Sequence, residues 1–318
     1  MRVLVTGASG FVGSHVCRLL RARQHDVITL RDGGRARGVE LSEAGVVLES
    51  VGACPPDAEV HLAARIRAAP GDPWRDVYAN NVTATYGLLA AVRAEAPRAR
   101  ILLASSSAVY RAVPRGRNPV TEDERLRPVS LYGASKVACE ALAWTHAAAG
   151  PGVVICRPFN LVGPGGEDRS ALAQWARQVA SIKRGLAPGV VRCGPLGTFR
   201  DLTDVRDAAR AYVSLVEAQE PPDVVNICSG AAHSGEEVMS LLLEEADVQA
   251  QIDSAPGATD DLEYQCGDNA RIVRSVGWCP EIPLRQSVRD VLAEWLAWDR
   301  AEGRDRGATG GEGHGDGK

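Results

Sequence analysis

Short apolar runs alternate with longer amphipathic stretches over the first half of the chain. The runs are rich in valine, isoleucine and leucine, whereas the longer stretches repeat their apolar residues at helical spacing. This alternation predicts an α/β fold, a doubly wound parallel sheet with helices on both faces. The expected strands are Val3–Val5, Val27–Leu30, Glu59–Leu62, Ile101–Ala104 and Val153–Cys156, and the expected helices are Ser14–Arg23, Val77–Arg93 and Tyr132–Ala148.

The stretch between the second and third expected strands interrupts this alternation. Its glycine-containing segment 33–45 shows no helical spacing of apolar residues, so it predicts a loop. One weak strand is expected near Val46–Leu48. We therefore expect the sheet to be trimmed at this point, without the helix that usually joins parallel strands.

Three glycines lie between the first expected strand and the first expected helix. Gly7 permits a backbone geometry at the turn that a side chain would obstruct. Gly10 lets the backbone approach a pyrophosphate held by the amides of the helix N-terminus, and Gly13 lets the helix pack closely on the sheet. This order of strand, glycines and helix predicts a dinucleotide-binding site of the Rossmann type.

The second half of the chain carries further helical patterns before a polar tail. We expect a first domain at residues 1–159, to which later segments return, and a smaller C-terminal α/β lobe at residues 160–300. The charged, Gly-rich segment 301–318 is expected to be disordered. The expected helices of this half are Ala171–Arg184, Val205–Glu217, Glu236–Glu245 and Arg285–Arg300.

Composition excludes several classes of partner. The 318 residues include 36 Lys and Arg against 40 Asp and Glu, for a net charge of −4. The chain therefore offers no basic footprint for nucleic acid or an anionic membrane. No apolar stretch reaches the roughly 18 residues of a membrane span. Because an expected strand starts at Val3, we expect no signal peptide.

Eight cysteines are scattered along the chain without a CxxC pair. Several lie in apolar runs, which is typical of reduced core residues in a cytoplasmic protein. Their spacing matches no set of metal ligands, so we expect no metal site.

The end of the second expected strand bears on the choice of cofactor. An acidic residue there binds the ribose hydroxyls of NAD, whereas an arginine accommodates the 2′-phosphate of NADP. Here Leu30 is followed by Arg31, with Arg35 and Arg37 just beyond. The sequence therefore favours NADP(H) with Arg31 as a ligand, while Asp32 leaves NAD(H) open.

A tyrosine, a lysine and a run of serines form a candidate site for acid/base chemistry. Tyr132 and Lys136 are four residues apart in an expected helix, so they share one face. An ammonium nearby favours the phenolate, which makes a tyrosine a better proton donor or acceptor at neutral pH. The run Ser105–Ser107 follows the strand Ile101–Ala104, at the carboxyl edge of the sheet where doubly wound folds bind ligands. A serine hydroxyl there can hydrogen-bond a substrate oxygen.

With these residues in view, the chain resembles the extended short-chain dehydrogenase/reductase family, which comprises nucleotide-sugar epimerases, dehydratases and ketoreductases. The resemblance covers about residues 1–298. It implies that residues 1–159 bind the dinucleotide and that residues 160–300 bind a nucleotide-diphosphate sugar. It rests on the segments Thr6–Gly13, His61–Ala64, Asn81–Val82, Ser105–Tyr110, Tyr132–Lys136, Arg157–Pro164, Phe199–Asp207 and Gly267–Trp278.

The resemblance also implies a role for each residue of the candidate site. Tyr132 would be the catalytic acid/base, and Lys136 its partner and a ligand of the nicotinamide ribose. Ser106 would touch the substrate as the catalytic hydroxyl, with its two neighbouring serines as alternatives. Besides Tyr132 and Lys136, the expected cofactor ligands are Gly7, Ser9, Gly10, Phe11, Val12, Gly13, Arg31, Leu62, Ala63, Ala64 and Asn81.

Three further residues match positions that hold the substrate in this family. Asn160 and Arg200 match residues that bind the sugar and the diphosphate, and Arg271 matches an arginine that reaches the nucleotide. A guanidinium fork suits a diphosphate on chemical grounds. The alternative for Arg200 is a structural ion pair with Asp201 or Asp204.

Among the branches of the family, the chain is most similar to reductases of GDP-4-keto-6-deoxy-D-mannose. That similarity lies in the segment 157–217. Dehydratases usually carry an acidic residue after the catalytic hydroxyl, whereas Ser107, Ala108 and Val109 follow it here. The sequence therefore favours an NAD(P)H-dependent ketoreductase acting on a GDP- or dTDP-linked 4-keto-6-deoxyhexose. Arg111, in place of a glycine of those reductases, leaves room for a different keto sugar.

Two other functions stay open. An NAD-dependent 4-epimerase of UDP-sugars would use the same residues for oxidation and re-reduction. A non-catalytic cofactor-sensing domain is disfavoured, because a sensor needs no proton donor. The family also implies a homodimer, whose interface the helices Val77–Arg93 and Tyr132–Ala148 would build.

Overall fold

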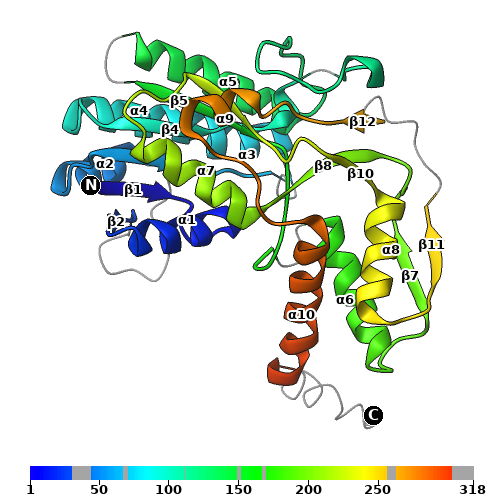
Figure 1. The fold of residues 1–318 in the computed structure, drawn as a ribbon. Coiled ribbons are helices and arrows are strands. Elements are labelled where there is room, and N and C mark those ends of the chain that lie inside the picture. Colours follow the sequence, from blue (N-terminus) through cyan, green and yellow to red (C-terminus); the bar gives the residue numbers. More distant parts are fainter. Residues whose placement is uncertain are drawn as a thin grey trace, which may run out of the picture. The chain divides into compact units, whose positions relative to one another are not determined.

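The structure is a computed structural model that describes residues 1–30, 44–66, 71–110, 112–148, 152–166, 170–255 and 263–302 (Figure 1). The chain divides into two compact units. The second unit comprises the described residues of Val162–Gly197, Ser234–Ala258 and Pro283–Lys318. The first unit comprises those of Met1–Leu161, Thr198–His233 and Thr259–Ile282. Every predicted site residue that the structure describes belongs to the first unit.

A parallel sheet forms the centre of the first unit. Its strands are β1 (Arg2–Thr6), β2 (Asp26–Ile28), β3 (Ala58–His61), β4 (Arg100–Ala104), β5 (Val153–Pro158) and β9 (Val224–Ile227). Their spatial order is β2-β1-β3-β4-β5-β9, and each neighbouring pair is parallel. The strand order reverses beside β1, which is the arrangement of a doubly wound sheet that binds ligands at its carboxyl edge. The predicted α/β fold with a Rossmann-type sheet is confirmed.

Helices cover both faces of this sheet (Figure 1). They are α1 (Phe11–Ala22), α2 (Ala44–Ala53), α3 (Pro73–Val77), α4 (Ala84–Glu95), α5 (Leu131–Ala147), α7 (Val205–Glu217) and α9 (Ala270–Val276). Along β1, Val3 and Val5 pack in one cluster with α1 and α7. Leu4, between them, packs in a second cluster with α2, α4 and α5. This alternation is the period of two that a strand with both faces buried requires.

The expectation of a loop and a weak strand before β3 is wrong in part, because Ala44–Ala53 forms helix α2. Adjacent valines favour a strand locally. In the fold, however, Val47 and Val51 lie one helical turn apart, and both are fully buried in the cluster that contains α4. Tertiary burial therefore decides the conformation here rather than local propensity.

The helix expected at Val77–Arg93 is divided into three parts. Helix α3 ends at Val77, the π-helical turn Tyr78–Thr83 follows, and α4 then continues. A π-helical turn inserts an extra residue into the helix and occurs frequently at functional sites. This one carries Asn81, whose side chain is buried.

Short strands form the remaining sheets. Strands β6 (Asn160–Val162), β8 (Phe199–Asp204), β10 (Ala232–Ser234) and β12 (Tyr264–Gln265) form one sheet of order β10-β8-β12, with β6 also paired to β8. In the second unit, β7 (Val190–Cys193) and β11 (Gln251–Ser254) form a parallel pair. Its helices are α6 (Ala171–Lys183), α8 (Gly235–Ala246) and α10 (Leu284–Glu302). The helices predicted for the second half of the chain are thus confirmed to within a few residues.

Some predictions lie outside the described residues. These are the cofactor segment with Arg31, Asp32, Arg35 and Arg37, the substitution at Arg111, and the tail beyond Glu302. No helix in the described part of the chain is long and apolar enough to cross a membrane. All eight cysteines are described, and they are free thiols.

Candidate active site

The glycine turn after β1 has no room for side chains. Gly7 has a φ of +68°, in the left-handed region, and a Cβ there would lie 2.8 Å from the amide nitrogen of Ala63. A Cβ on Gly13 would lie 2.1 Å from the carbonyl oxygen of Gly7. Helix α1 therefore packs directly on the turn, as the glycine pattern predicts.

The N-terminus of α1 fits the pyrophosphate of a dinucleotide. Gly10 is the N-cap, and among the described residues no side chain caps this helix. Its first turn carries no acidic residue. Uncapped amides and the positive end of the helix dipole form a site for an anion. Ser9 is exposed beside this turn, and Phe11 and Val12 begin the helix half-buried.

A chain of hydrogen bonds ties the loop Leu62–Ala64 to the strands below it. The Ala63 amide donates to Thr6 Oγ1 (3.3 Å), and Thr6 Oγ1 lies 2.7 Å from His61 Nδ1. On the other side of the ring, His61 Nε2 lies 3.0 Å from Thr85 Oγ1, which donates to the Cys139 thiol. Because the Thr85 proton is already donated, Thr85 accepts from His61, and the imidazole carries its proton on Nε2.

His61 is buried and uncharged. Burial and, to a smaller extent, the positive charge of Lys136 together lower its pKa to about 3. A neutral imidazole that bridges two threonines acts as a structural link between the sheet and its covering helices. The sequence pattern includes this histidine but does not indicate its partners.

Asn81 joins the loop after β3 to the helix that carries the tyrosine. Its Oδ1 accepts from the Arg65 amide (2.7 Å), while its Nδ2 donates to the Arg65 carbonyl (3.0 Å) and to Ser135 Oγ (2.9 Å). Ser135 in turn donates to the carbonyl of Tyr132. Asn81, which is expected to contact the cofactor, thus connects Arg65, just after the loop Leu62–Ala64, to Ser135 in α5.

Tyr132 and Lys136 share one face of α5, as their spacing predicts. Ser130 caps this helix by accepting from the Gly133 amide. The Lys136 ammonium is buried, donates to the carbonyl oxygen of Ala104 (2.7 Å) and lies 5.8 Å from the centre of the Tyr132 ring. The lysine charge is therefore held between the end of β4 and the phenol.

Gly133 brings α5 against the segment that follows β4. A Cβ at this position would lie 2.3 Å from the carbonyl oxygen of Ala108. Ala108 belongs to the short 3₁₀ turn Ser107–Val109, whose N-cap is Ser106. The absence of a side chain at Gly133 is what lets helix α5 approach the serine segment so closely.

The three consecutive serines have different surroundings. Ser106 is half-buried, and its hydroxyl accepts from the Ala108 amide (3.2 Å). Ser105 and Ser107 are buried. The Ser105 hydroxyl donates to Glu140 Oε1 at 2.5 Å. Of the three, Ser106 therefore has the surroundings best suited to meeting a substrate.

Behind these serines lies a buried polar network that the sequence did not predict. Glu140 accepts from Nε (2.9 Å) and Nη2 (2.7 Å) of Arg157, a bidentate pair. Arg157 Nη1 donates to the Tyr110 hydroxyl and to the Glu122 carbonyl, both at 3.0 Å. Burial alone would lower the pKa of Arg157, but its hydrogen bonds to Glu140 outweigh that effect and raise it. Arg157 is therefore charged.

The network continues to the position of Arg271. The Tyr110 hydroxyl donates to Asn226 Oδ1 (2.6 Å), and the Asn226 amide donates to Glu122 Oε1 (2.8 Å). Burial raises the pKa of Tyr110, so its hydroxyl keeps the proton that it donates. Arg271 forms ion pairs with Glu122 (3.4 Å) and Asp123 (2.8 Å). Tyr110, Arg157 and Arg271 lie in segments that carry the family resemblance, which is the one sequence signal that singles them out.

The other predicted substrate residues lie around β8. Asn160 is exposed, and its Nδ2 donates to the Asp201 carbonyl (3.4 Å). Arg200 is half-buried and donates to the Phe199 carbonyl. Burial raises the pKa of Asp201, although hydrogen bonds from Ser229 and neighbouring amides oppose the shift. The Asp201 carboxylate thereby anchors the loops after β9 and β12 beside Arg200.

The comparisons with known proteins agree with this fold and geometry. The model of the NAD dependent epimerase/dehydratase family matches residues 3–228. The chain therefore belongs to that family, the extended short-chain dehydrogenases/reductases.

Individual relatives narrow the class of reaction. The chain is 34% identical over 306 residues to GDP-6-deoxy-D-mannose reductase of Pseudomonas aeruginosa, covering 95% of this chain and 99% of the relative. It is 28% identical over 323 residues to UDP-glucose 4-epimerase of Corynebacterium glutamicum, covering 92% and 95%. The structure of RMD from Pseudomonas aeruginosa complexed with NADPH superposes with a TM-score of 0.85 at 32% identity, covering 93% and 98%. The protein is an NAD(P)-dependent nucleotide-sugar oxidoreductase/epimerase.

Proposed function

We propose that the protein is an NADPH-dependent ketoreductase acting on a nucleotide-diphospho-4-keto-6-deoxyhexose. The observation that carries this proposal is the position of Lys136, whose buried ammonium lies between the Ala104 carbonyl and the Tyr132 ring. The 34% sequence identity to a GDP-6-deoxy-D-mannose reductase, which extends over 95% of this chain, supports the same reaction class.

Proton transfer in this proposal is the work of the chain's own side chains. Bound NADPH supplies the hydride that reduces the ketone. Tyr132 donates its phenolic proton to the alkoxide oxygen that forms, and the Lys136 ammonium stabilises the phenolate left behind. The Ser106 hydroxyl donates a hydrogen bond to the same oxygen. These contacts strengthen as negative charge develops, so they favour the transition state over the ground state.

The anionic part of the substrate matches the basic residues of the first unit. Arg200 and Arg271 supply guanidinium groups for the diphosphate and nucleotide, and Asn160 supplies an amide for the sugar. Arg271 already pairs with Glu122 and Asp123, so a diphosphate would compete with Asp123, whose side chain is 80% exposed.

The direct test is an assay of NADPH absorbance with GDP-4-keto-6-deoxymannose made in situ by a dehydratase. We expect one NADPH to be consumed per sugar. Tyr132→Phe should lower kcat about 10²- to 10⁴-fold, the contribution of a positioned proton donor, and should leave NADPH binding intact. A wild-type protein that consumes no NADPH would exclude this substrate, and an unchanged rate in the variant would exclude the role of Tyr132.

A 4-epimerase is the second candidate, favoured by the similarity to a UDP-glucose 4-epimerase. An epimerase retains its cofactor and turns over without added nicotinamide, whereas a reductase consumes NADPH stoichiometrically. Incubation with UDP-glucose and no added cofactor separates the two. Dehydration remains disfavoured, because no carboxylate lies among Ser107, Ala108 and Val109.

The preference for NADPH over NADH is assigned to Arg31. Arg31→Ala should raise the KM for NADPH and leave the KM for NADH nearly unchanged, because only NADPH carries the 2′-phosphate. Equal changes in both values would contradict the assignment.

A homodimer through α4 and α5 completes the proposal. Four aromatic side chains of the helices on this side of the sheet are substantially exposed, and an interface through these helices would bury them. Sedimentation of the wild type and of Tyr86→Ser tests the interface, since the variant should shift toward monomer. The exposed side chains are Trp74 (67%), Tyr78 (59%), Tyr86 (62%) and Trp144 (39%).

A further inference from the structure

Four polar residues near the active site have no role in the proposed reaction, yet they are among the most buried of the molecule. Tyr110, Glu122, Glu140 and Arg157 are between 1% and 8% exposed. Burying charged groups is costly unless each is paired and hydrogen-bonded. All four belong to the hydrogen-bonded network described above, at the carboxyl edge of the sheet.

Glu140 has a specific relation to the catalytic helix. Tyr132, Lys136 and Glu140 follow one another at intervals of four residues, so they lie along one face of α5. The glutamate therefore belongs to the same row of side chains as the phenol and the ammonium. Its own contacts, however, are made with β4 and β5 rather than with the reacting atoms.

The contacts of Glu140 join the three elements that must be aligned for catalysis. Its Oε1 accepts both from the Ser105 hydroxyl, at the end of β4, and from Arg157 Nε in β5. Ser105 directly precedes Ser106, and the Ser105 amide donates to Cys156 in β5 (2.7 Å). One carboxylate thus fixes the serine segment and the tyrosine helix against the same strand.

We propose that Glu140 is a positioning residue for catalysis, acting through the Ser105 hydroxyl to hold Ser106 in register with Tyr132 and Lys136. The inference rests on the proposed function, because it assigns the same site a supporting residue. A displacement of the reacting groups by about 1 Å can cost on the order of 10²-fold in rate. Functional groups must be held to within about 0.5 Å, which requires a support locked by its own hydrogen bonds.

Stability alone gives no reason for this arrangement. A buried arginine–carboxylate pair contributes little net stability compared with apolar residues of similar volume. The Glu140–Arg157 pair instead fixes the orientation of the carboxylate, because the bidentate guanidinium and the Ser105 hydroxyl together hold its oxygens in one geometry. We therefore assign the network the role of holding the serine segment and α5 in position.

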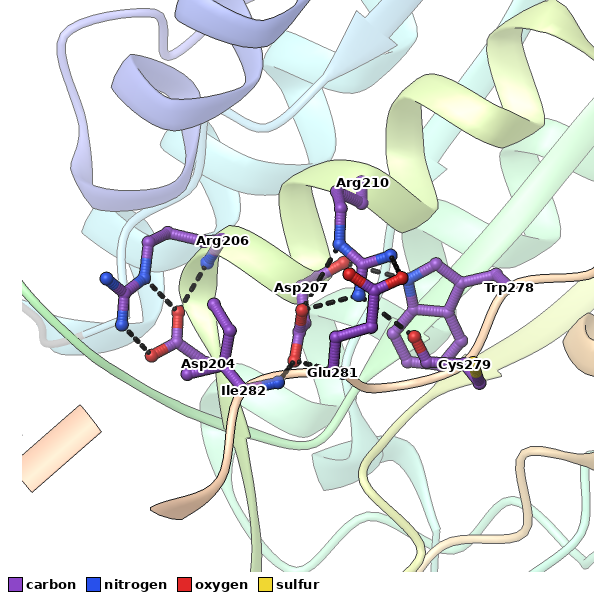
Figure 2. Close-up of polar contacts among 8 residues, drawn as sticks. All are labelled: Asp204, Arg206, Asp207, Arg210, Trp278, Cys279, Glu281 and Ile282. Carbon is purple, nitrogen blue, oxygen red and sulfur yellow. Dashed lines mark hydrogen bonds and ion pairs between the residues drawn. The ribbon is translucent and has the colours of Figure 1, made fainter. Parts of the chain in front are cut away.

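The test compares two variants of the link with a matched control. Ser105→Ala removes the hydroxyl and leaves the Glu140–Arg157 pair intact, while Glu140→Gln removes the charge. The control is Asp207→Asn. Asp207, near the start of α7, is also a fully buried carboxylate paired with an arginine, Arg210, but neither residue is assigned to the proposed site (Figure 2). Each variant is assayed for kcat, KM of the keto sugar, NADPH affinity and Tm.

We expect Ser105→Ala to lower kcat about tenfold and Glu140→Gln about 10²-fold, with KM and NADPH affinity within about twofold of wild type. Asp207→Asn should lower Tm and leave kcat unchanged. The proposal is overturned if Ser105→Ala lowers Tm with kcat intact. It is also overturned if Ser105→Ala loses as much rate as Ser106→Ala, because Ser105 would then be the reacting hydroxyl itself. If Glu140→Gln does not fold, the result for Ser105→Ala alone decides whether the proposal holds.

Amide hydrogen exchange separates this inference from the proposed reaction. Exchange over residues 105–110 should rise in Ser105→Ala and stay at the wild-type level in Asp207→Asn. If wild type consumes no NADPH, the proposed function fails, whereas the link is still tested by exchange. Unchanged exchange in Ser105→Ala would show that the hydroxyl holds nothing in place.

Discussion

Two clusters of arginines and carboxylates in the first unit hold their charges in contrasting ways. Beneath the candidate active site, Glu140 and Arg157 are both buried, with side-chain exposures of 2% and 5%. At the start of α7, Asp207 is fully buried but its partner Arg210 is 29% exposed. Figure 2 shows this second cluster, in which Arg210 also reaches Glu281.

The partners of the carboxylates differ as well. Asp207 accepts from the amides of Glu281 and Ile282, and the Asp207 carbonyl accepts from the indole of Trp278 (Figure 2). Backbone amides carry no net charge, so this cluster mainly fastens the segment after α9 to α7. Glu140 instead accepts from one buried guanidinium and one buried hydroxyl. An arginine–carboxylate pair thus anchors a backbone segment where the arginine is partly exposed to water. Where both side chains are buried, the pair fixes the relative positions of the elements that carry them.

Glu59 in β3 is a third buried carboxyl group, and it pairs with no arginine that the structure describes. Neither of its oxygens has a hydrogen-bond partner among the residues that the structure describes. Burial raises its pKa from 4.5 to about 8. His61, two residues on along the same face of the strand, is neutral, so it supplies no positive charge to Glu59. The folded protein therefore holds Glu59 as the neutral acid.

The largest expected effect is the pH dependence that Glu59 imposes on stability. The folded-state pKa is the higher one, so the contribution of Glu59 is fully present below about pH 4.5 and is lost as the pH rises to about 8. At about 1.4 kcal/mol per unit, the loss relative to Glu59→Gln is roughly 5 kcal/mol. Urea unfolding of both proteins between pH 4.5 and 8.5 measures it. If the unfolding free energies of the two proteins vary in parallel with pH, Glu59 is not held as a neutral acid and must have a charged partner.

The next largest effect is expected for Arg157→Met, which leaves the charge of Glu140 buried without its partner. The free energy of unfolding should fall by about 3–5 kcal/mol. Adding Glu140→Leu should restore most of it, because the double variant buries no unpaired charge. If the double variant is no more stable than the single one, the pair is not the source of the loss.

A smaller loss is expected for Asp207→Asn, because Arg210 keeps its access to water and its bond to the Cys279 carbonyl. Weakened bonds to two backbone amides should cost about 1–3 kcal/mol, measured by thermal unfolding. A loss as large as that of Arg157→Met would remove the contrast between the two clusters.

The smallest effect is expected for Glu281→Gln in the same cluster. The Glu281 side chain is 65% exposed, so its pair with Arg210 is screened by water and salt. The loss should stay below about 1 kcal/mol and vanish in 1 M salt. A larger, salt-independent loss would mean that this edge of the cluster is effectively buried.

The sheet and most of its helices could be predicted from the sequence, because their signals are local. Apolar periodicity located α5, α7 and α10, and the first helix was expected at Ser14–Arg23, whereas α1 begins three residues earlier, at Phe11. Helix α2 could not be found in this way, since its helical state depends on the burial of Val47 and Val51 in a cluster with α4. Strand β9 was also missed.

The predicted pair of Tyr132 and Lys136 needed only helical spacing, so the sequence located it. The buried polar network behind them differs, because its hydrogen-bond partners are far apart in the sequence. The hydrogen bond between Tyr110 and Asn226 joins residues 116 positions apart, and that between Glu122 and Asn226 spans 104. No periodicity within one element indicates such partners. They become visible only when parallel strands bring their carboxyl ends to one edge.

The sequence by itself determined the glycine turn after β1, the class of fold and the tyrosine–lysine helix, because each depends on backbone sterics and spacing within a few residues. Only the tertiary structure decided that Ser105 is tied to Glu140 while Ser106 stays half-buried. It also decided that His61 is neutral and that Glu59 is buried with no hydrogen-bond partner in the described part of the chain. Burial and pairing are properties of the assembled sheet, and they set the charge and orientation of side chains that the sequence can only name.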